Sequence, residues 1–187
     1  MTRKQAAISG FAWGAIGGAA LVALMYFSSA VFGLRPLPQL LNEPLLAILP
    51  GPVFGFLIDT LQHAGKVVEE LGLVVAMVVA LAALGAASAV AGLRWKSRYM
   101  PFAFAGAGWV AVVAILLPVS GQGFLGLDGG PATSIVWAML FAIYAVVLQW
   151  GAEPSPAFDG GRRRILSAVP VGLGLASVGA LAYELLP

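Results

Sequence analysis

The 187-residue sequence is 60% hydrophobic and only 10% charged, which is more apolar than a water-soluble domain of this size can bury. Its net charge of +2 is too small, and its basic residues too scattered, for nucleic-acid binding. The lack of cysteine excludes disulfides, thiolate metal sites, iron–sulfur clusters and cysteine nucleophiles on these residues. We therefore expect a single transmembrane domain over residues 1–187, with the lipid bilayer as its main solvent.

Five segments are apolar over a length that can cross a bilayer as a helix. They are residues 8–34, 67–93, 99–119, 132–151 and 165–186. The predicted fold class is therefore all-α, a polytopic membrane helix bundle of about five transmembrane helices. The apolar run of the first segment is about twice as long as the core of a signal peptide, so we interpret it as a retained span.

Residues 35–66, between the first two predicted spans, form an interfacial segment with five prolines, which forbid one continuous helix. Pro52 can begin a short helix, because the amide that it lacks is unsatisfied at that position anyway. The apolar face of this helix consists of Phe54, Leu57 and Leu61, and its polar stripe of Asp59, His63, Lys66 and Glu70. This pattern predicts an amphipathic helix on the outer membrane surface that runs into the second span.

The positions of Lys and Arg predict the orientation of the chain. Eight of the ten basic residues fall on one side of the predicted membrane, and they are Arg3, Lys4, Arg94, Lys96, Arg98, Arg162, Arg163 and Arg164. The positive-inside rule assigns this side to the cytoplasm. We therefore expect a cytoplasmic N-terminus and an external C-terminus in the inner membrane of a bacterium.

Small residues at intervals of four predict close helix packing. The candidate packing residues are Gly10, Gly14, Gly18, Ser88, Gly92, Gly172 and Ala176. This pattern is common inside polytopic bundles, so it favours contacts within the chain over dimerisation. Dimerisation through the first span stays an alternative.

The polar residues near the outer boundary form a candidate partner face, namely Asp59, His63, Lys66, Glu70 and Asp128. A solvated surface explains them most simply, and contact with a partner or a quinone is the alternative. His63 is the single histidine, so haem held between two histidines within the chain is excluded. No charged residue is expected at the middle of a span, which argues against a transporter.

The stretch LPQLLNEPLLAILPGPVFGFLIDTLQHAGK, Leu37 to Lys66, resembles the membrane-anchoring N-terminal region of bacterial sulfite-oxidase-like, molybdopterin-dependent oxidoreductases. Arg162, Arg163 and Arg164, followed by Ile165 and Leu166, are typical of a topology signal. They also resemble the internal twin-arginine segment that precedes the exported molybdenum domain in that family.

This resemblance implies a non-catalytic membrane anchor or subunit that holds a molybdopterin-type oxidoreductase domain at the outer membrane surface. The family's catalytic domain, including the cysteine that ligates molybdenum, has no counterpart in this sequence. We therefore assign no catalytic, cofactor-binding or metal residue, expect no activity from these residues alone, and expect molybdopterin on a linked or partner domain. The alternative function is a small structural accessory subunit of a larger respiratory or photosynthetic membrane complex.

Overall fold

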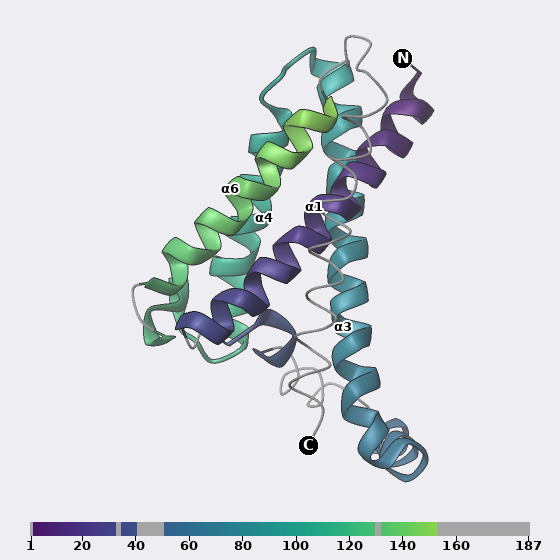
Figure 1. Ribbon diagram of the computed structural model, residues 1–187, viewed down its shortest axis with the longest axis vertical. Coiled ribbons are helices and arrows are strands. Elements are labelled where there is room, and N and C mark those ends of the chain that lie inside the picture. The colour runs from purple at the N-terminus through teal and green to yellow at the C-terminus, as the bar shows by residue number, and fades with distance from the viewer. Residues whose placement is uncertain (1, 33–34, 41–50, 130–131, 153–187) are drawn as a thin grey trace.

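The computed structural model describes residues 2–32, 35–40, 51–129 and 132–152, and every regular element among them is a helix. In chain order the elements are α1 (Arg3–Phe32), α3 (Gly51–Trp95), α4 (Met100–Ala111), the π-helical turn η1 (Val112–Leu116), α5 (Leu117–Val119), the 3-10 helix η2 (Phe124–Gly129) and α6 (Ala132–Ala152). Figure 1 shows the long helices side by side, alternating in direction. The prediction of an all-α bundle is confirmed.

Four helices of the described part are long and apolar enough to cross a membrane. These spans are Arg3–Val31, Glu70–Trp95, Met100–Val119 and Thr133–Ala152. Each overlaps one of the first four predicted segments, whereas the fifth, residues 165–186, lies outside the described residues. The chain is therefore a membrane protein.

The spans form a closed arrangement in which α1 packs against α3 and α6, and α4 packs against both of these helices. Three of the spans each contribute a fully buried residue to the core, namely Leu21, Leu117 and Tyr144. Leu81 of α3 belongs to the same buried cluster. Val79, Ile115 and Met139 instead expose more than half of their surface. Because these spans cross a bilayer, the exposed apolar side chains face lipid.

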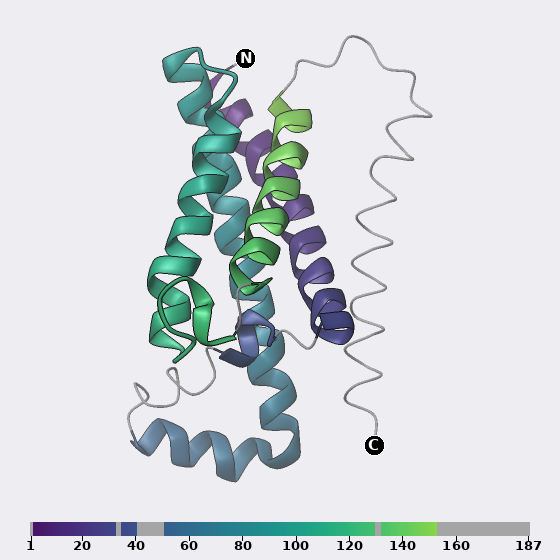
Figure 2. The same cartoon turned by 90° about the vertical axis from the view of Figure 1, so that its left-hand side faces the viewer.

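α3 continues without a break from the interfacial segment into the second span. It begins at Gly51, with Pro52 in its first turn, and extends over 45 residues to Trp95. Figure 2 shows that the first part of α3 lies across one end of the bundle and then bends into the span. The side chains of residues 51–69 are outside the described set, so the amphipathic character of this transverse segment stays a prediction.

The third span contains a π-helical turn that the sequence analysis did not predict. The Leu117 N–H donates to the Val112 carbonyl, five residues back, immediately before Pro118. A proline ring crowds the carbonyl four residues before it, so the wider turn relieves that contact. The span then ends in a Schellman motif, in which the Gln122 N–H donates to the Leu117 carbonyl at 2.9 Å and Gly121 adopts a φ of 75°.

Candidate functional site

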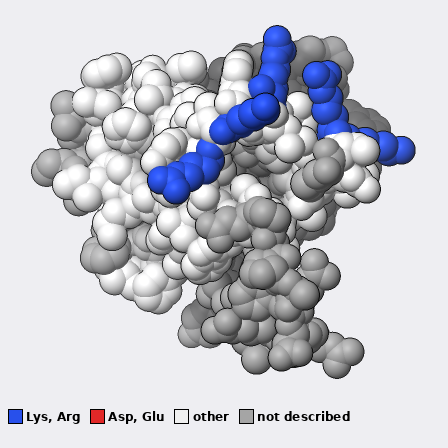
Figure 3. All heavy atoms as spheres, turned by 90° about the horizontal axis from the view of Figure 1, so that it is seen from above, with Lys and Arg blue, Asp and Glu red and all other residues white. Residues whose placement is uncertain are grey.

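The two ends of the bundle carry different charges. Arg3 and Lys4 of α1 lie at the same end as Arg94, in the last turn of α3, and Lys96 and Arg98 of the α3–α4 turn, and all five are exposed. Figure 3 views this end from above and shows the basic side chains spread over its face. Arg35 is exposed beyond the other end of α1. The remaining three predicted basic residues, Arg162, Arg163 and Arg164, are outside the described residues.

A close backbone contact joins α1 to α3 through glycines of both helices. A Cβ placed on Gly10 or Gly14 would lie within 3.0 Å of the α3 backbone, and one placed on Gly18 would lie 3.0 Å from the Leu81 Cβ. On α3, a Cβ at Gly85 would lie 2.5 Å from the Gly10 carbonyl oxygen. The three predicted glycines of α1 therefore lie at a contact within this chain.

Two further predicted packing residues lie near the basic end of α3. The Ser88 hydroxyl is buried and donates to the Gly85 carbonyl at 2.8 Å. Gly92 lies beside the following turn, where an added Cβ would make ordinary contact with the Ser97 carbonyl oxygen. Gly172 and Ala176 lie outside the described residues.

Tyr144 of α6 lies where three helices meet. Its hydroxyl donates to the Leu81 carbonyl of α3 at 2.5 Å, and its ring packs against Gly17 of α1. The ring also meets Phe141 edge to face, with centroids 6.3 Å apart. Phe141 in turn packs over Gly108 of α4, so one aromatic pair connects all four spans.

Tyr26 and Glu70 form the most polar contact described at the opposite end. The Tyr26 hydroxyl, on a side chain only 6% exposed, donates to Glu70 Oε1 at 2.8 Å. Nearby, the Leu37 N–H donates to the Met25 sulfur at 3.3 Å, and Pro36 is fully buried. These contacts fix residues 35–40 and the start of the second span against α1.

The other members of the predicted partner face lie at this same end of the bundle by their backbone positions. Asp59, His63 and Lys66 belong to the first part of α3, and Asp128 belongs to η2. The Ser134 hydroxyl of α6 donates to the Leu125 carbonyl and so holds η2 against α6. The side chains of these four residues are outside the described set, so Glu70 is the only member whose contact is seen.

Sequence reasoning missed Tyr26, Tyr144 and Gly85, which make the contacts that unite the helices. Gly85 had a detectable signal, because it begins a run of five small residues that ends at Ala89. The two tyrosines gave no such signal, since their partners are 44 and 63 residues away along the chain.

The described side chains offer no obvious centre for chemistry. Among them, no group of three or more His, Cys, Asp or Glu residues could hold a metal ion. The Trp109 Nε1 and the Gln149 Oε1 are buried without a hydrogen-bond partner in the described part of the chain.

The chain matches no known protein family, no curated protein sequence and no solved structure.

Proposed function

We propose that this chain is a non-catalytic membrane anchor that holds a molybdopterin-type oxidoreductase domain at the outer surface of a bacterial inner membrane. The observation that carries the proposal is the continuity of α3. Its first part lies across the end of the bundle and continues as one helix into a span. A transverse helix joined to a span offers a partner a more fixed surface than a loop of the same length does.

The distribution of charge supports an external position for this surface. Lys and Arg near short loops face the cytoplasm in most membrane proteins. Five described basic residues lie at the end of the bundle away from the transverse segment. The transverse segment and η2 are then external, on the side where an exported domain would dock.

The proposed class of partner rests on the sequence resemblance of residues 37–66, a stretch that includes the start of α3. The residues of this chain cannot ligate molybdenum as that family does, because the family uses a cysteine ligand and this sequence contains no cysteine. The proposed mechanism is therefore positional. An anchor confines the catalytic domain to the membrane surface and so raises its effective concentration near membrane electron carriers.

The outer end has an excess of acidic residues that suits a basic partner surface. By sequence position the acidic residues are Glu43, Asp59, Glu69, Glu70, Asp128 and Glu184, against Arg35 and Lys66. Opposite charges at a docking surface mainly guide encounter and orientation. Glu70 already accepts a hydrogen bond from Tyr26, so a substitution there would also remove a contact within the chain. Asp59 and Asp128 are therefore the better residues for testing this interaction.

Purification from native membranes tests the function. We expect the tagged chain to carry molybdenum, measured by inductively coupled plasma mass spectrometry, together with pterin fluorescence after oxidation. A denaturing gel then separates a domain linked to this chain from a separate subunit. Preparations without molybdenum, in which only other polytopic proteins accompany the chain, would favour the accessory-subunit function instead.

Charge reversal tests the docking surface. The double variant Asp59→Lys with Asp128→Lys should weaken association with the catalytic domain and reduce its salt dependence. The matched control is Glu153→Lys with Asp159→Lys, which makes the same charge change on the predicted cytoplasmic side. Equal losses in both variants would contradict docking at the outer end.

A further inference from the structure

The basic end of the bundle, defined by Arg3, Lys4, Arg94, Lys96 and Arg98, carries charge that the described carboxylates do not balance. All five side chains are exposed. Glu70 is the only carboxylate whose side chain the structure describes, and it lies at the opposite end. By sequence, the stretch that follows α6 contains Glu153 and Asp159 but also Arg162, Arg163 and Arg164, so its own net charge is positive.

The α3–α4 turn presents its charges in an ordered arrangement. The Arg98 Nη2 donates to the Tyr99 hydroxyl at 3.0 Å, and the guanidinium carbon lies 5.1 Å from the centroid of the Tyr99 ring. The Tyr99 N–H donates to the Ser97 hydroxyl at 3.3 Å, and Lys96 adopts a φ of 51°. A guanidinium has five N–H donors, so its bond to Tyr99 leaves others to reach a ligand.

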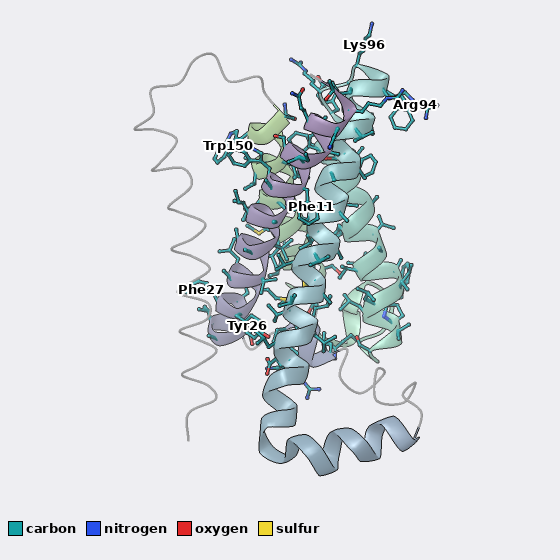
Figure 4. The ribbon with its side chains drawn as sticks, turned by 90° about the vertical axis from the view of Figure 1, so that its right-hand side faces the viewer. Phe11, Tyr26, Phe27, Arg94, Lys96 and Trp150 are labelled. Atoms are coloured by element: carbon teal, nitrogen blue, oxygen red, sulfur yellow. The ribbon has the colours of Figure 1, made fainter. Side chains whose placement is uncertain are left out.

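Aromatic side chains set the depth of this end in the bilayer. Trp95, Tyr99 and Trp150 are 62%, 61% and 57% exposed, although each is close to an apolar span. Figure 4 shows Trp150 at the same end as Arg94 and Lys96, which extend away from the helices. Exposed Trp and Tyr prefer the headgroup level of a membrane. The basic side chains beside them therefore lie in the layer of lipid phosphates.

We propose that the basic end binds the headgroups of anionic phospholipids, with Arg98, held on the Tyr99 ring, as the main phosphate ligand. Arg94, in the last turn of α3, and Lys96 of the α3–α4 turn supply further positive charge. Lipid is favoured over a soluble polyanion because the spans fix this end in a layer where phosphate groups are already concentrated. This inference is independent of the anchor function.

Lipid competition in the purified full-length chain tests the proposal. Native mass spectrometry in mixed micelles would compare retention of phosphatidylglycerol with that of phosphatidylcholine. We expect the wild type to retain phosphatidylglycerol preferentially. Arg94→Gln with Arg98→Gln should weaken this binding by about fivefold for each charge removed. The matched control, Arg35→Gln with Lys66→Gln, removes two charges at the other end and should bind like the wild type.

Three outcomes would overturn the proposal. They are equal retention of both lipids by the wild type, an equal loss in the control, and displacement of the lipid by millimolar inorganic phosphate. Arg94→Lys with Arg98→Lys keeps both charges and should retain most of the binding. If the glutamine variant does not fold, retention of phosphatidylglycerol by the wild type is measured over a range of salt concentrations instead. Headgroup binding must weaken as the salt concentration rises, so retention that is independent of salt would contradict the proposal.

Discussion

The Tyr26 hydroxyl donates to Glu70 Oε1 at 2.8 Å and thereby connects α1 to the residue at which the second span begins. Tyr26→Phe should lower the free energy of unfolding by about 1–2 kcal/mol, because a half-buried carboxylate loses a donor. Thermal unfolding in detergent measures the change. The control is Phe27→Leu, since Phe27 is adjacent in α1 but 64% exposed. Equal effects of the two substitutions would contradict a stabilising role for this hydrogen bond.

Glycine substitutions distinguish close helix contacts from lipid-facing positions. Gly85→Ala should destabilise the bundle by about 1–3 kcal/mol, because its Cβ would lie 2.5 Å from the Gly10 carbonyl oxygen and 2.7 Å from the Gly14 Cα. Gly72 and Gly106 have no atom within 4 Å of an added Cβ. Alanine at either control position should be neutral or stabilise by up to about 1 kcal/mol, since alanine favours helix. Unfolding curves in one detergent compare all three variants, and a destabilised control would contradict this assignment.

The Tyr144 junction predicts separate contributions from the hydroxyl and the ring. Tyr144→Phe removes only the bond to Leu81, which should cost about 1 kcal/mol, as is usual for hydrogen bonds between membrane helices. Tyr144→Ala also leaves a cavity beside Gly17 and Phe141, so its cost should rise to about 3–5 kcal/mol. Ile143→Ala, at the exposed neighbouring residue, is the control in the same unfolding assay. A large effect of Ile143→Ala would mean that this face of α6 is covered.

The lack of cysteine in the sequence makes the predicted orientation directly testable. Ser97→Cys and Gln122→Cys place single thiols at opposite ends of the third span. In intact cells a membrane-impermeant maleimide should label Cys at 122 but not at 97, and both should react after permeabilisation. Labelling only at 97 would reverse the orientation and place the proposed docking surface in the cytoplasm.

The sequence predicted the elements of this fold better than it predicted the contacts between them. Hydrophobic length is a local property, so the first four spans were recognisable, and Pro52 correctly indicated a helix start. The contact between Tyr26 and Glu70 depends on how two helices face one another, which no local pattern specifies. The π-helical turn before Pro118 was also not predictable in detail. The proline predicts an irregularity in the helix, but it does not specify that this irregularity is a π-helical turn.

The candidate partner face was predictable only as a group of residues near one end. The polar spacing from Asp59 to Glu70 indicates one helical stripe, and the backbone of that stretch is helical. The sequence could not indicate that Glu70 turns toward α1, because that depends on Tyr26, 44 residues away. Long-range contacts of this kind require the arrangement of the spans.

The glycine contact between α1 and α3 also has a consequence for biogenesis. These are the first two spans in the described chain, and their interface is built largely from backbone and alanine, with little dependence on α4 or α6. Helices inserted into a bilayer can associate as soon as both are present. A hairpin of α1 and α3 can thus assemble while the ribosome is still translating the rest, and α6 then closes over it by placing Tyr144 on Gly17.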